Sequence, residues 1–117
     1  MARLSTHVLD TARGVPAQGV TVELHILDSG TRRHVTTAAT NADGRTGAPL
    51  LSGERVEIGV YELTFHAGDY LRNTGAALSD PPFLDQIVVR FGVADATGNY
   101  HVPLLLSPFG YSTYRGS

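Results

Sequence analysis

The chain has 117 residues, of which 42% are apolar, so it suits one domain with one hydrophobic core and excludes a two-domain enzyme. Nine basic and eleven acidic side chains leave a net charge of −2, and we therefore expect no nucleic-acid partner. All nine basic residues are arginines and there is no cysteine, which excludes Schiff-base lysines, disulfides and thiolate zinc sites.

Short segments that alternate apolar and polar residues recur along the whole chain, and this period of two is typical of half-buried β-strands. The alternation is clearest over residues 20–26, 61–66 and 86–93. In chain order, strands are predicted at residues 4–10, 20–26, 33–40, 55–58, 61–66, 86–93, 100–107 and 111–115. Turn-forming sequences such as Asp28-Ser29-Gly30 separate them. About eight strands without long helical patterns indicate an antiparallel sandwich.

A helix fits the sequence only over residues 69–79, where the Pro81-Pro82 pair is expected to end it. No apolar run approaches the roughly 20 residues that are needed to cross a bilayer, so we expect no membrane contact. The first seven residues also lack the apolar stretch of a secretory signal. We therefore expect one domain over residues 1–117, located in the cytoplasm.

The five histidines are the candidates for proton transfer at neutral pH. His25 and His66 lie on the polar faces of their predicted strands and His34 follows a turn, so solvated or structural roles are expected for these three. His7 and His101 lie inside otherwise apolar strands, where an imidazole needs a partner or a function. The sequence leaves open whether the faces that carry these two side chains meet.

Other signals of chemistry are weak. Glu23 and His25 share a strand face but lack a third ligand, so we expect no metal site. No Gly-x-Ser-x-Gly elbow or Gly-x-Gly-x-x-Gly turn is present, which disfavours a serine nucleophile and a dinucleotide site. Arg45 follows the turn at residues 41–44, where it could be a solvated loop residue or a fixed cation. The hydroxyl-rich segment 111–117 would by default be a frayed tail.

Three blocks of sequence taken together are more specific. They are Ser-Thr-His-Val-Leu-Asp at residues 5–10 with Gly-Val-Pro-Ala at 14–17, Thr-Asn-Ala-Asp-Gly-Arg at 40–45, and Tyr-His-Val-Pro-Leu-Leu-Leu-Ser-Pro at 100–108 leading to Tyr-Arg-Gly-Ser at 114–117. With these blocks the chain resembles the 5-hydroxyisourate hydrolases, a transthyretin-related family, from Leu4 to its last residue. The Tyr-Arg-Gly-Ser ending distinguishes these hydrolases from transthyretin itself.

The resemblance implies an all-β, transthyretin-like sandwich of two four-stranded antiparallel sheets with one short helix. It also implies a homotetramer, built as a dimer of dimers, with active sites at the interface between the dimers. The residues that it places in the site are His7, Arg45 and His101 at catalytic positions and Tyr114, Arg115, Gly116 and Ser117 as substrate-binding lining.

The implied reaction is the hydrolytic opening of the cyclic amide of 5-hydroxyisourate, the product of urate oxidation, to 2-oxo-4-hydroxy-4-carboxy-5-ureidoimidazoline, with no cofactor or metal. A neutral imidazole can take a proton from the attacking water, and an arginine can stabilise the oxyanion that forms. Either His7 or His101 fits the role of base, with the other orienting water or protonating the leaving nitrogen. Arg45 fits the electrostatic role.

Two other functions are compatible with a sandwich fold. A transthyretin-like carrier would bind a small aromatic ligand in a channel between dimers without transforming it, but it has no need of the two histidines, the arginine and the hydrolase ending as a set. An immunoglobulin-like adhesion module would behave as a monomer and bind no small molecule.

Overall fold

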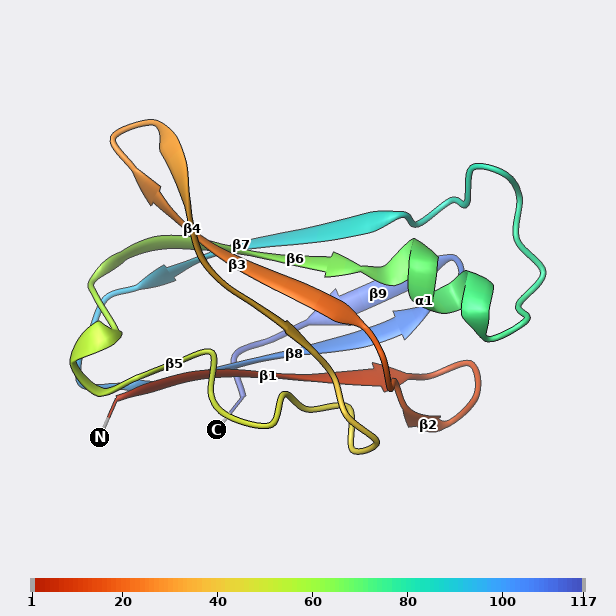
Figure 1. The fold of residues 1–117 in the computed structure, drawn as a ribbon, viewed down its shortest axis with the longest axis horizontal. Coiled ribbons are helices and arrows are strands. Elements are labelled where there is room, and N and C mark those ends of the chain that lie inside the picture. Colours follow the sequence, from red (N-terminus) through yellow and green to blue (C-terminus); the bar gives the residue numbers. More distant parts are fainter. Residues whose placement is uncertain (1, 117) are drawn as a thin grey trace.

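The computed structural model describes residues 2–116, which form two β-sheets packed face to face (Figure 1). The strands are β1 (Arg3–Asp10), β2 (Val15–Pro16), β3 (Thr21–Asp28), β4 (Thr31–Ala39), β5 (Leu51–Ser52), β6 (Gly59–His66), β7 (Gln86–Val93), β8 (Asn99–Ser107) and β9 (Gly110–Thr113). The helices are the single α-helix α1 (Ala67–Asn73) and the 3-10 turn η1 (Gly53–Arg55). The predicted all-β sandwich with one short helix is confirmed.

The first sheet has the order β2-β1-β8-β9, with β5 also paired to β1, and the second has the order β4-β3-β6-β7. Every strand pair is antiparallel except β1 and β8, which run parallel in register from Arg3–Asn99 to Asp10–Leu106. The structure differs in two respects from the predicted pair of four-stranded antiparallel sheets. Strands β1 and β8 run parallel, and the pairing of β5 with β1 makes the first sheet five-stranded. No hairpin joins β1 to β8, so the local turn sequences could not reveal how these two strands pair.

One core fills the space between the inner faces of the sheets. The alternation predicted for residues 20–26 is confirmed, because Val22 and Leu24 are fully buried while Glu23 and His25, the residues that follow each of them, are not. Burial of each such apolar side chain stabilises the fold by about 1.5–3 kcal/mol. Further fully buried apolar side chains come from both sheets: Leu4, Val8, Val20, Leu63, Phe65, Leu104 and Leu106.

The helix differs from its predicted range of residues 69–79. It begins two residues earlier and ends at Asn73, because Gly75 adopts a left-handed backbone at φ +79° and its N–H bonds to the Arg72 carbonyl. A glycine in this conformation terminates a helix, and here it does so well before the prolines. No helix within residues 2–116 is long and apolar enough to cross a membrane.

The strand predicted at residues 55–58 is also wrong. Gly53 has φ +63° and starts the turn η1, whose last residue is Arg55. The next strand, β6, begins only at Gly59. A glycine at positive φ bends the chain away from the extended path that a strand requires.

Candidate functional site

The parallel pairing of β1 and β8 brings the two singled-out histidines together on the outer face of the first sheet. Ser5 is the register partner of His101, and His7 lies two residues further along β1 on the same face. The imidazole rings of His7 and His101 have centroids 6.5 Å apart and planes inclined by 35°. Both side chains are half-buried, because their neighbours Val8 and Val102 point into the core instead.

Arg45 reaches this face through a tight turn. The side-chain oxygen of Asn41 accepts a hydrogen bond from the Arg45 backbone N–H at 3.3 Å. Gly44 before it has φ +75°, and a Cβ there would come within 2.4 Å of the Val8 carbonyl oxygen, so only glycine fits. Arg45 then forms a β-bridge with His7. The exposed arginine is thereby anchored beside the histidines through its backbone.

A backbone carbonyl sets the protonation pattern of His7. Its Nε2 atom lies 2.9 Å from the carbonyl oxygen of Asp43. A carbonyl oxygen only accepts hydrogen bonds, so Nε2 must carry the hydrogen. In the neutral ring, Nδ1 of His7 is therefore the nitrogen with the lone pair.

His101 is held at its side chain and at its backbone. Its Nδ1 atom lies 2.9 Å from the Ser5 hydroxyl oxygen, and its carbonyl accepts a hydrogen bond from the Gly116 N–H at 2.7 Å. Burial lowers the pKa of His101 below its ordinary value, and the positive charge of Arg45, together with that of His7 when His7 is protonated, lowers it further. The ring is therefore neutral at neutral pH and retains a lone pair.

A pocket of about 190 Å³ adjoins this group of side chains. Ser5 and Arg45 line it together with Arg3, Thr6, Thr46, Gly47, Ala48 and Pro49. Its walls bear arginine cations and hydroxyl groups, which suit a ligand with several hydrogen-bond acceptors. Small residues of the 46–49 segment leave the pocket open to solvent.

The predicted tail residues divide between two places. Gly116 contacts His101, and a Cβ at Gly116 would lie only 2.7 Å from the Cδ2 atom of that ring. Arg115 points elsewhere: its guanidinium carbon lies 4.1 Å from the centre of the Tyr100 ring, and it donates a hydrogen bond to the Asn99 carbonyl at 3.2 Å. This cation–π contact holds the tail against β8.

Tyr114 and Arg115 line a different pocket, of about 260 Å³, with Val89 and Phe91 of β7. The Tyr114 side chain is 59% exposed. Within one copy of the chain, these two side chains are thus separate from the group formed by the histidines, Arg45 and Gly116. Ser117, the last predicted site residue, lies outside the described residues.

The remaining histidines have the structural roles that the sequence predicted. His66 pairs with Glu23 at 2.5 Å between Nε2 and Oε2, and this hydrogen bond lowers the pKa of Glu23. His25 lies 3.3 Å from a guanidinium nitrogen of Arg32, and His34 is exposed and bonded to a threonine. Within residues 2–116, no three histidine or acidic side chains are grouped to hold a metal ion.

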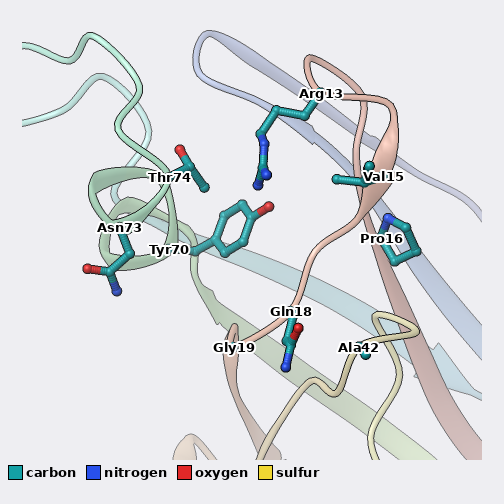
Figure 2. Close-up of a pocket in the computed structure, with 9 residues that line it drawn as sticks. All are labelled: Arg13, Val15, Pro16, Gln18, Gly19, Ala42, Tyr70, Asn73 and Thr74. Carbon is teal, nitrogen blue, oxygen red and sulfur yellow. The ribbon is translucent and has the colours of Figure 1, made fainter.

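Another pocket, of about 540 Å³, lies between the loop after β1 and the end of α1 (Figure 2). Figure 2 shows the Arg13 side chain extending toward the Tyr70 hydroxyl. That hydroxyl donates a hydrogen bond at 2.8 Å to Asp10, which is 2% exposed. Burial and the Asp10 charge raise the pKa of Tyr70. The hydrogen bond between Tyr70 and Asp10 thus ties α1 to β1.

Sequence reasoning gave no role to two residues that the structure makes prominent. Ser5 is the hydrogen-bond partner of His101. The sequence feature that could have pointed to it is that Ser5 lies two residues before His7, which places both side chains on the same face of one strand. Asp10 is a buried carboxylate. The sequence feature that could have pointed to it is its position at the end of an apolar strand, where a carboxylate needs a partner. The partners of both come from distant segments, so the sequence alone did not show them.

A model of the HIUase/Transthyretin family, where HIUase denotes 5-hydroxyisourate hydrolase, matches residues 4–116. The chain belongs to this family. Among its relatives, the 5-hydroxyisourate hydrolase of Mesorhizobium japonicum is 59% identical over 115 residues, which are 98% of this chain and 92% of the relative. The resemblance inferred from the three sequence blocks is therefore confirmed.

Similar solved structures include a 5-hydroxyisourate hydrolase and a transthyretin. The 5-hydroxyisourate hydrolase of Klebsiella pneumoniae has a TM-score of 0.82 and 34% identity, with all of both chains covered. Sea bream transthyretin in complex with thyroxine has a TM-score of 0.88 and 28% identity, covering 97% of this chain and 94% of that one. Since both have the same fold, the fold alone does not distinguish the hydrolase from the thyroxine-binding protein, and the side chains of the site must do so.

Proposed function

We propose that the chain is a 5-hydroxyisourate hydrolase, a single hydrolase domain over residues 1–117. The observation that carries this proposal is the convergence of His7, Arg45 and His101 on one outer face of a sheet. Curated relatives of the chain bear that enzyme's name, two of them at 56% and 59% identity. The reaction adds water across a C–N bond of the cyclic amide and yields 2-oxo-4-hydroxy-4-carboxy-5-ureidoimidazoline.

His101 is proposed as the general base. Its lowered pKa keeps the ring neutral, and Ser5 occupies Nδ1, which leaves Nε2 for the attacking water. His7 presents the lone pair of Nδ1, because its Nε2–H is bonded to the Asp43 carbonyl. A water between the two rings can give one proton to His101 while its second hydrogen is held by His7.

Water attack on the ring carbonyl places a negative charge on the carbonyl oxygen. The Arg45 guanidinium is a permanent cation whose charge acts on His101, and it is proposed to stabilise this oxyanion. As the tetrahedral centre collapses, the C–N bond breaks and the proton held by His101 passes to the leaving nitrogen. These side chains supply the base, the acid and the electrostatic stabilisation, so the proposed reaction needs no cofactor or metal.

The tail is proposed to bound the substrate site through Gly116. Tyr114, Arg115 and Ser117 are proposed to add polar contacts in the assembled oligomer. Deletion of residues 114–117 is then expected to abolish turnover and to leave a folded oligomer. Normal turnover by this deletion variant would exclude a role for the tail.

A homotetramer of two dimers, located in the cytoplasm, completes the proposal. The outer face that carries the histidines also carries Leu9 and Leu105, which are only half-buried and are available to a second copy. Strands β7 and β9 are sheet edges within residues 2–116, and a second copy can pair with such an edge. Light scattering measures the assembly state, and a site shared between copies predicts that activity falls on dilution.

The test is the decay of ultraviolet absorbance of 5-hydroxyisourate, freshly generated from urate, with and without the purified protein. Wild-type protein should accelerate the decay, and His101→Ala should lose about 10²–10⁴-fold of that activity. His34→Ala is the matched control, because His34 is exposed and lies on the other sheet. If His101→Ala is as active as wild type, the assignment of the base is wrong. Spontaneous decay alone with folded wild-type tetramer would instead favour the carrier function.

A further inference from the structure

The Ser5 hydroxyl contacts the ring of the proposed base, and the sequence assigned this side chain no role of its own. Its Oγ atom lies 2.9 Å from Nδ1 of His101, within the range of a direct hydrogen bond. The contact joins residues 96 positions apart in the sequence, so it exists only because β1 and β8 pair. Both backbones belong to central strands of the first sheet, which fixes the two side chains relative to each other.

We infer that Ser5 is a positioning residue, which holds the His101 ring in the tautomer that carries hydrogen on Nδ1 and the lone pair on Nε2. Which ring nitrogen of a histidine is protonated is set by the hydrogen bond that the other nitrogen makes. Among residues 2–116, Nε2 of His101 has no hydrogen-bond partner, whereas Nδ1 has Ser5. In the inferred tautomer the lone pair lies on Nε2, where it is free to accept a proton.

A serine is suited to this task because its hydroxyl oxygen can accept the Nδ1–H bond and carries no charge. While the ring is neutral, Oγ accepts the Nδ1–H bond, and it continues to accept it after Nε2 has taken a proton. A carboxylate in the same place would raise the pKa of the imidazole and keep it charged. Ser5 orients the ring without adding charge, so the lowered pKa caused by burial, Arg45 and His7 is preserved.

Gly116 supports the same ring from another direction. Its N–H binds the His101 carbonyl, and it has no side chain, so it packs close to the edge of the ring that holds Cδ2. The ring is thus held by Ser5 at Nδ1 and bounded by Gly116 near Cδ2. Nε2 lies between these two ring atoms on the remaining edge. This arrangement leaves one nitrogen accessible for chemistry.

The catalytic part of this inference rests on the proposed function, but the tautomer can be measured independently of activity. Long-range ¹H–¹⁵N correlation spectra of uniformly ¹⁵N-labelled tetramer or monomer identify which nitrogen of each histidine carries hydrogen. In the wild type, His101 should be protonated mainly at Nδ1. Ser5→Ala should move His101 toward the tautomer mixture of a free imidazole, while Ser5→Thr, which keeps the hydroxyl, should resemble wild type.

Activity provides the second measurement. Ser5→Ala should lower kcat about 10- to 100-fold with little change in KM, because a misplaced base affects the chemical step more than binding. Ser5→Thr should restore most of the rate. Ser5→Asp should move the acidic limb of the pH profile to higher pH, since a carboxylate raises the pKa of the ring. Ser107→Ala, whose hydroxyl bonds a backbone carbonyl on the same sheet, is the control that should keep wild-type kcat.

The outcomes separate the two proposals. An unchanged His101 tautomer in Ser5→Ala would overturn the positioning role, whatever the activity. Equal loss in Ser5→Thr and Ser5→Ala would do the same, because the hydroxyl would then be irrelevant. If wild-type protein does not accelerate hydrolysis but Ser5→Ala still shifts the tautomer, the proposed function fails and the role of Ser5 in fixing His101 stands.

Discussion

Gly116 offers the sharpest test of the site geometry, because its lack of a side chain allows the tail to approach His101. A Cβ at this position would lie 2.7 Å from Cδ2 of the imidazole, whereas ordinary van der Waals contact begins near 3.4 Å. In Gly116→Ala, the ring or the tail must therefore move by about 0.7 Å. The Gly116 N–H is bonded to the His101 carbonyl at 2.7 Å, so movement of either partner disturbs the other.

A misplacement of about 1 Å in an active site can cost roughly 10²-fold in rate. We therefore expect Gly116→Ala to lower kcat for 5-hydroxyisourate about 10- to 100-fold, which is about 1.4–2.7 kcal/mol of activation free energy. The change lies near the chain end and outside the core, so we expect a change in unfolding free energy within about 0.5 kcal/mol. Initial rates of absorbance decay and urea unfolding measure the two quantities.

Gly110→Ala is the matched control for this substitution. It adds the same methyl group near the end of the first sheet, but its Cβ would meet only the Ser107 hydroxyl at 3.8 Å. Its activity should equal that of wild type. Wild-type kcat in Gly116→Ala would refute the reasoning, because the close approach to the ring would then have no bearing on the reaction. Equal loss in both variants would show an unspecific effect of the added methyl groups.

Three further predictions concern charges and buried hydrogen bonds. Arg45→Gln removes a cation that lowers the pKa of His101, so the ring should titrate at higher pH by NMR; an unchanged or lower pKa would contradict the electrostatic assignment. Tyr70→Phe leaves a buried oxygen of Asp10 without its hydrogen-bond partner and should lower the free energy of unfolding by about 1–3 kcal/mol. Calorimetry should show this as a Tm lower by about 4–12 °C. A Tm within about 1 °C of wild type, which is on the order of the scatter for neutral surface changes, would contradict the prediction. Glu62 is buried and paired with two arginines, and the hydrogen bond from Arg90 lowers its pKa. Its contribution to stability is therefore present above about pH 4.3 and is lost as the pH falls through the lowered pKa. Urea unfolding should show a weaker dependence of stability on acid pH for Glu62→Gln than for wild type, and equal pH dependence in the two proteins would disprove this.

Strands were predicted correctly where apolar and polar residues alternate strictly along the sequence. Residues 20–26 alternate strictly, and the structure buries Val22 and Leu24 as expected. Residues 69–79 and 55–58 were mispredicted because glycines at positive φ, Gly75 and Gly53, end or redirect the chain. A glycine has no side chain to reveal which conformation it adopts, so the sequence showed that a turn was possible but not where the chain would use it.

The sequence named candidate residues for the site but did not show how they are arranged. The motifs singled out His7, Arg45 and His101, and the structure brings these three together on one outer face. Tyr114 and Arg115 were expected to line the same site, but within one chain their side chains lie in another pocket. An alternating pattern states which side of a strand a residue occupies, whereas it says nothing about which strand lies alongside.

By itself, the sequence determined the fold class, the family and the residue types available for chemistry, because these follow from local periodicity and from contiguous motifs. Only the tertiary structure decided that β1 and β8 run in parallel, and therefore that Ser5 faces His101. This pairing joins segments about 96 positions apart, and no turn connects them. Its register is set by burying alternate residues of both strands in one core, a condition that the whole chain must satisfy at once.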